Sequence, residues 1–122
     1  MQIERSVLIA DDEPMLLKIL SRVLKRMGLN VIAVEDGEAA VNVIDRQSED
    51  VHLVVLDLNM PVMDGAAAFH AISELKPDIP VLISSGDGRE HVLSRLNMQP
   101  AGIISKPYNL NDLRQIISDN IS

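Results

Sequence analysis

Five short runs of aliphatic residues recur along the chain, and each is followed by a polar turn and a segment with helical spacing. The runs lie at 7–10, 31–34, 53–56, 81–83 and 103–104. A continuous apolar run is typical of a strand that is buried on both faces, as in a parallel sheet. Short strands that alternate with helices predict an α/β domain, because right-handed crossovers leave few other topologies.

The segments between these runs carry apolar residues three and four positions apart. Pro14 suits the opening turn of the first helix, and Gly28 suits its end. The face expected to pack on the sheet consists of Leu16, Leu20, Val23, Leu24 and Met27. Four further helical faces follow at 39–44, 65–75, 92–96 and 110–117. No internal linker or repeat interrupts this pattern, so residues 1–122 are predicted to form one domain.

Polar side chains stand where several of the predicted strands end. Asp57 directly follows the run 53–56, and ligands of open α/β sheets bind at the carboxyl edge. The other strand ends contribute Asp11 and Asp12 after the first run, Ser84 and Ser85 at the fourth, and Lys106 after the fifth. If these ends share one edge of one sheet, the side chains converge on Asp57.

Such a group of side chains has a definite chemistry. Clustered carboxylates repel one another unless a cation lies between them, and a site built only of oxygen ligands favours Mg²⁺. Asp57 can then act as a nucleophile toward phosphorus, while Lys106 neutralises charge and a serine hydroxyl bonds a phosphoryl oxygen. Each residue alone also fits a structural role, such as a helix-capping acid or a surface charge. Together they predict a site that forms an aspartyl phosphate.

Composition narrows the class of protein. The 122 residues include 18 acidic and 11 basic side chains, and the net charge of -7 argues against direct binding of nucleic acid. The chain has no cysteine, which excludes a disulfide framework and a thiolate metal site. No apolar run approaches the roughly 20 residues of a membrane span, and the first five residues are too polar for a signal peptide. We therefore expect a cytoplasmic protein without direct membrane contact.

Four segments resemble the receiver domain of two-component response regulators, of the kind typified by the chemotaxis regulator. They are Ile9-Ala10-Asp11-Asp12-Glu13-Pro14, Leu56-Asp57-Leu58-Asn59-Met60-Pro61-Val62-Met63-Asp64-Gly65, Ser85-Gly86 and Lys106-Pro107. The resemblance is collinear and covers nearly the whole chain. It implies a single doubly wound, flavodoxin-like parallel sheet of five strands in the order 2-1-3-4-5, with five helices.

The resemblance also implies roles for individual residues. Asp57 would be the phosphoacceptor and, with Asp12, a direct ligand of Mg²⁺. Asp11 would act on the metal through water, and the backbone carbonyl of Asn59 would complete the protein ligands. Lys106 would pair with the phosphoryl group, and the Lys106-Pro107 peptide is commonly cis in this family.

Two further positions of the family site concern how phosphorylation is signalled to the surface. The resemblance favours Ser85 as the hydroxyl that bonds the phosphoryl group, because it begins the Ser-Gly pair five residues after Pro80, with Ser84 as the alternative. Where the family often has an aromatic residue three positions before the lysine, this chain has Ile103. The surface formed by the fourth helix, fifth strand and fifth helix is therefore expected to respond mainly through displacement of loop and helix. Tyr108 is interpreted as a packed aromatic at the strand exit.

The leading hypothesis is a phosphorylation-dependent signalling switch, not an enzyme. It would take its phosphoryl group from a histidine kinase or a histidine phosphotransfer domain and control an effector protein or attached domain that the sequence does not identify. An aspartate-nucleophile phosphohydrolase is the enzyme alternative, but it commonly needs an acid at position 59, which is Asn59 here. A flavin site is disfavoured because the first strand-helix loop is acidic. The chain is either a stand-alone regulator or part of a larger protein, and its 101–108 segment is similar to receivers of hybrid histidine kinases.

Overall fold

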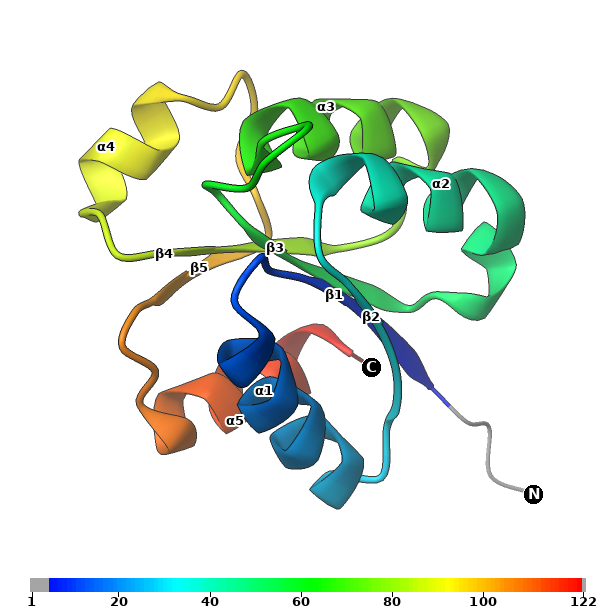
Figure 1. Ribbon diagram of the computed structural model, residues 1–122, viewed down its shortest axis with the longest axis vertical. Helices are drawn as coiled ribbons and strands as arrows, with labels where there is room; N and C mark the ends of the chain where they lie inside the picture. The colour runs from blue at the N-terminus through cyan, green and yellow to red at the C-terminus, as the bar shows by residue number, and fades with distance from the viewer. Residues whose placement is uncertain (1–4, 122) are drawn as a thin grey trace.

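A parallel sheet of five strands runs through the middle of the molecule in the computed structural model (Figure 1). The structure describes residues 5–121, so the ends of the predicted domain, 1–4 and 122, lie outside the described residues. The strands are β1 (Ser6–Ala10), β2 (Asn30–Val34), β3 (Leu53–Asp57), β4 (Val81–Ser85) and β5 (Gly102–Ser105). Their order in space is β2-β1-β3-β4-β5, as predicted.

Helices cover both faces of the sheet, which makes the fold doubly wound (Figure 1). One face carries α1 (Pro14–Arg26) and α5 (Leu110–Asn120). The other carries α2 (Gly37–Gln47), α3 (Gly65–Leu75) and the short α4 (Arg89–Ser94), and a 3₁₀ turn, η1 (Ser48–Asp50), precedes β3. Within residues 5–121, none of the helices has the length and apolarity that a bilayer crossing requires.

Local sequence accounts for most helix ends. Pro14 opens α1, where its missing N–H costs nothing. Asp36, Asp64 and Asn109 each accept a hydrogen bond from the backbone N–H three residues ahead and so cap α2, α3 and α5. Gly28 follows the end of α1 with φ +83, a left-handed conformation that favours glycine.

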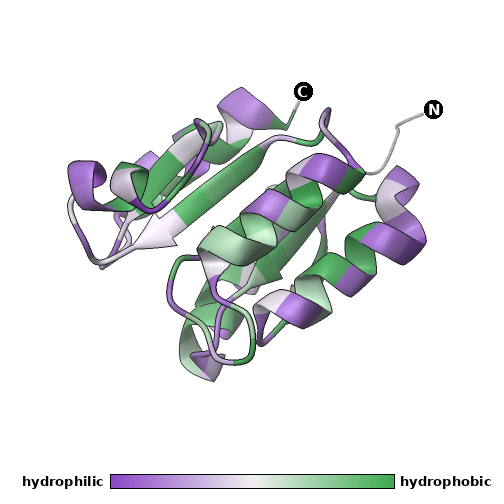
Figure 2. Cartoon of the chain, turned by 90° about the horizontal axis from the view of Figure 1, so that it is seen from above, coloured by the Kyte–Doolittle hydropathy of each residue, from purple (hydrophilic) through white to green (hydrophobic). Residues whose placement is uncertain are grey.

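The core has two parts, one on each face of the sheet, and the apolar stripes of the helices face it (Figure 2). Every residue of β3 is buried, in accordance with a central strand. The predicted face of α1 was wrong at one position: Leu17 is buried with Leu20, Val23 and Leu24, whereas Leu16 is only half-buried. Both leucines fit a helical period, and the position of α1 over the sheet selects Leu17.

Strand register brings the candidate site together. β1 and β4 flank β3, and Asp57 lies beside Ser84 in the ladder. The backbone continues this alignment beyond the strands, because Leu58 N–H donates to the Ser84 carbonyl at 2.9 Å and Lys106 N–H to the Ser85 carbonyl at 2.8 Å. The carboxyl ends of the central strands therefore meet at one edge, as the sequence predicted.

Val62 carries backbone strain in the loop between β3 and α3. Its φ is +68, and the Met63 N–H donates to the Pro61 carbonyl at 2.7 Å across it. A left-handed β-branched residue costs about 1 to 3 kcal/mol, and the side chain is 76% exposed, so little packing offsets that cost. We expect Val62→Gly to raise the free energy of unfolding by about 1 kcal/mol. Urea unfolding would measure it.

The matched control for this substitution is Asn97→Gly. Asn97 is also an exposed loop residue, but its φ is not positive. Glycine there adds freedom to the unfolded chain and relieves no strain, so it should lower the free energy of unfolding by about 0.5 to 1 kcal/mol. Equal destabilisation by both substitutions would contradict the strain at Val62.

Candidate functional site

Three carboxylates meet at the carboxyl edge of the sheet. Asp11 and Asp12 follow β1, Asp57 ends β3, and one oxygen from each lies within 4.8 Å of the others. Asp11 and Asp57 are buried, at 3% and 5% exposure, whereas Asp12 is exposed. The cluster therefore has two fixed acids inside and one at the entrance, where solvent and a small ligand can reach it.

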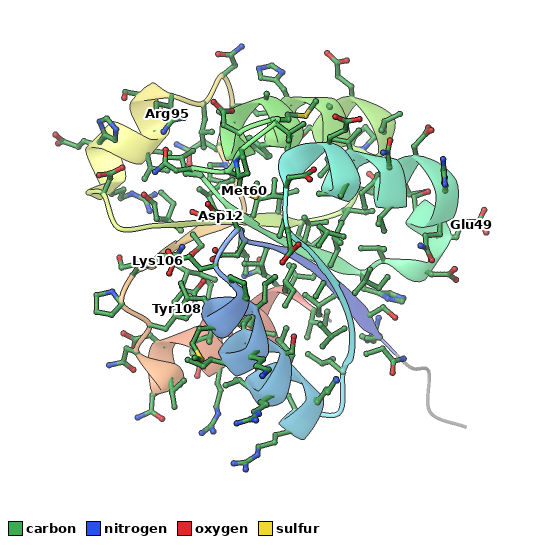
Figure 3. The ribbon with its side chains drawn as sticks, viewed as in Figure 1. Asp12, Glu49, Met60, Arg95, Lys106 and Tyr108 are labelled. Carbon is green, nitrogen blue, oxygen red and sulfur yellow. The ribbon has the colours of Figure 1, made fainter. Side chains whose placement is uncertain are left out.

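Lys106, which directly follows β5, reaches this cluster with its ammonium group. Its Nζ lies 3.0 Å from Asp11 Oδ2, 3.3 Å from Asp57 Oδ2 and 4.0 Å from Glu13 Oε1. Figure 3 shows Lys106 and Asp12 near each other, where the strands end. The peptide between Lys106 and Pro107 is cis, as the resemblance implied. One ammonium thus faces three acids, and the cluster keeps a net negative charge.

The remaining oxygen positions fit a hard cation. Asp11 Oδ1 accepts the Glu13 N–H at 2.9 Å, while Asp11 Oδ2 is buried, accepts no hydrogen bond from residues 5–121 and has only the ionic contact with Lys106. Asp57 Oδ1 accepts the Asn59 N–H at 3.3 Å. Carboxylate oxygens with free lone pairs are the ligands that Mg²⁺ takes in proteins. The donor set of Asp11, Asp12 and Asp57 therefore fits Mg²⁺.

Burial dominates the electrostatics of the Asp57 carboxylate. It raises the pKa of Asp57 to about 6, and the nearby Asp11 charge adds to the rise, while Lys106 and the Asn59 N–H oppose it. Burial disfavours the charged form of Lys106, but its contacts with Asp11 and Asp57 outweigh this and raise the pKa of the ammonium. The pKa of Asp57 rises because burial and the Asp11 charge outweigh Lys106, and the pKa of Lys106 rises because its acidic partners outweigh burial. Asp57 therefore titrates close to neutral pH.

The two candidate hydroxyls have different partners. Ser84 and Ser85 are both 1% exposed. The Ser84 hydroxyl is hydrogen-bonded to the Tyr108 hydroxyl at 2.9 Å. Ser85 Oγ accepts the Asp87 N–H at 3.0 Å, which leaves its own proton free to be donated. The Ser84 hydroxyl is thus engaged by another side chain, whichever of the two hydroxyls donates, whereas the Ser85 hydroxyl is bonded only by a backbone N–H among the contacts of residues 5–121.

The comparison with known families agrees with this geometry. Residues 7–118 match the model of the response regulator receiver domain. The chain belongs to the receiver domain family. Receiver domains are phosphorylation-dependent switches of two-component signalling, and the Asp11, Asp12 and Asp57 cluster fits a phosphoryl-accepting aspartate with Mg²⁺.

Curated relatives include receiver segments of much longer proteins. The chain is 34% identical to the autoinducer 1 sensor kinase/phosphatase LuxN of Vibrio campbellii, over 93% of its own length and 13% of that protein. It is 33% identical to the peroxide stress-activated histidine kinase mak1 of Schizosaccharomyces pombe, over 93% of its own length and 7% of that protein. This receiver domain therefore spans a small part of these relatives.

Solved structures share the fold. The CheX-CheY-BeF3-Mg+2 complex from Borrelia burgdorferi contains a chain 29% identical to this receiver, with a TM-score of 0.84, 96% of this chain covered and 89% of that one. A CheY-like receiver protein from Methanospirillum hungatei gives a TM-score of 0.89 at 22% identity, covering 98% and 94%. At that identity the likeness concerns the fold alone.

Two contacts of this receiver had no signal in the sequence. The first is the bond between Ser84 and Tyr108, since Tyr108 was interpreted as packing only. The second is made by Arg95, which donates to Asn59 Oδ1 at 2.7 Å and to Asp64 Oδ2 at 3.2 Å. Both join residues far apart in the sequence, and no motif marks either Tyr108 or Arg95.

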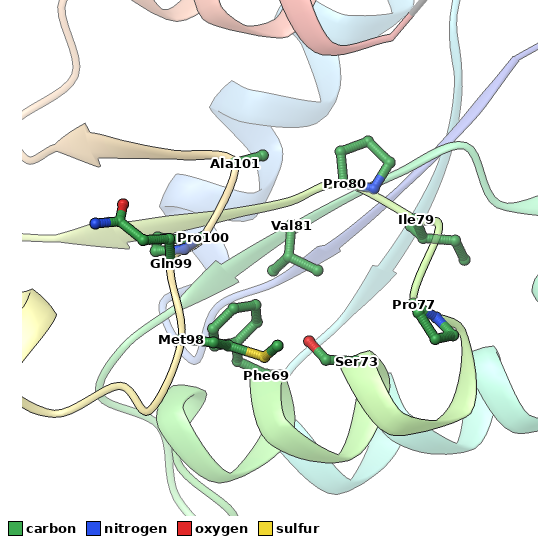
Figure 4. Close-up of a pocket in the computed structure, with 10 residues that line it drawn as sticks. All are labelled: Phe69, Ser73, Pro77, Ile79, Pro80, Val81, Met98, Gln99, Pro100 and Ala101. Carbon is green, nitrogen blue, oxygen red and sulfur yellow. The ribbon is translucent and has the colours of Figure 1, made fainter.

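A separate hollow of about 290 Å³ lies at the other end of β4 (Figure 4). It is lined by Phe69, Ser73, Pro77, Ile79, Pro80, Val81, Met98, Gln99, Pro100 and Ala101. None of these side chains is a carboxylate or an ammonium. The hollow thus lacks the groups that phosphoryl chemistry needs, whereas the edge of the sheet at Asp57 carries them.

Proposed function

We propose that Asp57 accepts the phosphoryl group and that Mg²⁺ is held by Asp12, Asp57 and the Asn59 carbonyl, with Asp11 acting through water. The observation that carries the proposal is the buried Asp57 carboxylate, 3.3 Å from Lys106 and clustered with two further acids. When bound, Mg²⁺ supplies positive charge that offsets the charge of the acids and of the phosphoryl oxygens.

The transfer uses the ionised form of Asp57. A carboxylate oxygen attacks phosphorus, a P–O bond forms, and the P–N bond of the donor phosphohistidine breaks with its electron pair going to the imidazole nitrogen. Lys106 pairs with the charge on the transferred group, and the Ser85 hydroxyl donates a hydrogen bond to a phosphoryl oxygen. Because the pKa of Asp57 is raised to about 6, transfer to the metal-free site slows in acid, where the nucleophile is protonated.

A groove of about 500 Å³ beside Lys106 is our proposed docking site for the phosphodonor. It is lined by Glu13, Leu16, Ile19, Lys106, Pro107, Tyr108 and Leu110. Ile19 and Leu110 are 40% and 45% exposed, so an apolar surface adjoins the acceptor. A histidine kinase or phosphotransfer domain could cover it with an apolar helix face and bring its histidine to Asp57. Kinase names among the relatives, such as LuxN and mak1, support this class of partner.

Acetyl phosphate with Mg²⁺ tests the proposed function against turnover by an enzyme. We expect intact-mass spectrometry to show one added phosphoryl group per chain, formed stoichiometrically and lost slowly. Asp57→Asn keeps the side-chain shape without the anionic nucleophile, so it should remain unlabelled. Equal labelling of this variant would refute Asp57 as the acceptor.

Sustained release of phosphate from many phosphate esters would instead favour a phosphohydrolase. Asn59 argues against that outcome, because an amide cannot serve as the general acid or base of such an enzyme. We therefore propose a signalling protein that is modified once and read by a partner. The loop after β4, α4 and the surface of β5 and α5 would carry the readout.

A further inference from the structure

Arg95 joins three separate elements next to the acceptor site. It follows the last turn of α4, and its Nη1 donates to Asn59 Oδ1 at 2.7 Å. Its Nη2 donates to Asp64 Oδ2 at 3.2 Å, while Asp64 Oδ1 caps α3 by accepting the Ala67 N–H. Figure 3 shows Arg95 at the end of α4, on the side of the sheet where Met60 lies. One guanidinium therefore holds both ends of the loop between β3 and α3.

That loop carries a ligand position of the proposed metal site. Asn59 stands two residues after Asp57, and its N–H donates to Asp57 Oδ1. Its side chain is exposed, so packing alone does not fix it. Val62 strains the same loop. The bond from Arg95 is thus the contact that restrains the Asn59 side chain and, through it, the direction of the Asn59 carbonyl.

The same bond ties α4 to the loop. α4 has six residues, of which only Val92 is buried, so the helix itself contributes little to its own placement. Ile103 occupies the position where the family often has an aromatic residue, and it has no ring to rotate. A short helix followed by a forked charge-assisted contact provides another physical link between the site and the α4 surface.

We propose that Arg95 is a positioning residue of the acceptor site: it presets Asn59 for Mg²⁺ and couples occupancy of the site to the placement of α4. The inference rests on the proposed function, because it takes the Asn59 carbonyl as a metal ligand. It adds the residue that directly follows α4 to a site otherwise built from the ends of β1, β3, β4 and β5. By thermodynamic reciprocity, a metal that binds better when Arg95 holds Asn59 also stabilises that position of α4.

Electrostatics alone would act in the opposite direction. The Arg95 guanidinium is a positive charge near a site for a divalent cation, and removing it should tighten Mg²⁺ binding if charge were its only influence. Loss of positioning should instead weaken binding, as happens when a residue that orients a metal ligand is removed. The sign of the change therefore decides between the two.

The experiment is a Mg²⁺ titration of the unphosphorylated full chain, followed by amide chemical shifts in ¹H–¹⁵N spectra. We expect Arg95→Gln to weaken Mg²⁺ binding roughly three- to ten-fold. At saturating Mg²⁺, we also expect this variant to show smaller metal-induced shift changes in α4 (89–94) and unchanged ones around Asp12. Arg89→Gln removes the same charge from the other end of α4, where Arg89 is exposed, and should not weaken binding.

A double-mutant cycle separates positioning from general loosening of the fold. If Arg95 acts through the Asn59 side chain, Asn59→Ala should weaken Mg²⁺ binding similarly, and adding Arg95→Gln should cost nothing more. Additive losses would overturn the proposal, as would unchanged or tighter binding by Arg95→Gln alone. If Mg²⁺ caused no chemical-shift change near Asp57 in the wild type, the proposed metal site itself would be overturned. Failure of the proposed function can therefore be told apart from failure of the proposed role of Arg95.

Discussion

Gly65→Ala is expected to destabilise the protein by about 3 kcal/mol or more, a large fraction of the stability of a domain of this size. A Cβ at Gly65 would lie 2.2 Å from the Asp57 carbonyl oxygen and 2.7 Å from Leu58 Cα. Both are backbone atoms at the end of β3 and cannot move away as a flexible side chain could. Relieving these close contacts would require α3 to move away from β3, and this movement would stretch the 2.8 Å hydrogen bond from the Gly65 N–H to the Leu58 carbonyl. Urea unfolding followed by circular dichroism measures the loss.

Gly86→Ala is the matched control for this substitution. A Cβ there meets no atom within 4 Å, and the φ of Gly86 is not in the left-handed region. Alanine should leave stability unchanged or raise it slightly, because it reduces the freedom of the unfolded chain. If Gly65→Ala were as stable as Gly86→Ala, the close approach of α3 to the end of β3 would be contradicted.

The fold and the acid cluster could be predicted because their signals are local. Each strand contains an apolar run of two to four residues, and the chain places Asp57 at the end of the run 53–56. Parallel strands then bring their carboxyl ends to one edge whatever the details of packing. Asp11, Asp12 and Lys106 gather around Asp57 for that reason.

The contacts that the sequence did not predict depend on the relative placement of whole elements. Leu16 and Leu17 satisfy the same helical period, and only the seat of α1 on the sheet buries Leu17. The bond from Ser84 to Tyr108 spans 24 positions, and that from Arg95 to Asn59 spans 36. Neither pair has a fixed spacing from which it could be recognised. Such contacts need the packed structure.

Asp57→Asn is expected to stabilise the metal-free protein at pH 7. The pKa of Asp57 is about 6 in the folded protein, against an ordinary value of 3.8. The folded state therefore holds its proton more tightly than the unfolded state, so the free energy of unfolding falls as the pH rises from about 4 to about 6. The contribution of protonated Asp57 is full below about pH 4 and lost above about pH 6. A shift of this size corresponds to about 3 kcal/mol, of which we expect about 1 to 2 after solvent screening through the exposed Asp12 side.

The measurement is urea unfolding of wild type and Asp57→Asn between pH 4 and pH 8. The asparagine variant should have a flatter pH profile and the higher free energy of unfolding at pH 7. Asp45→Asn is the control, because Asp45 is an exposed residue of α2 and loses the same formal charge. If Asp45→Asn gave an equal gain, net charge would explain the effect and burial of Asp57 would not.

Mg²⁺ should offset the loss of stability that the ionised carboxylates of the cluster cause. A cation that binds only the folded state raises its stability by mass action, by about 1.4 kcal/mol at ten times the dissociation constant. Millimolar Mg²⁺ is therefore expected to raise the melting temperature of the wild type at pH 7 and to have little effect on Asp12→Ala, which lacks the carboxylate at the entrance.

Without metal, Asp12→Ala should be at least as stable as the wild type, because one source of repulsion on Asp57 is gone. If Mg²⁺ raised the melting temperature of both proteins equally, the ion would bind at a site that does not use Asp12.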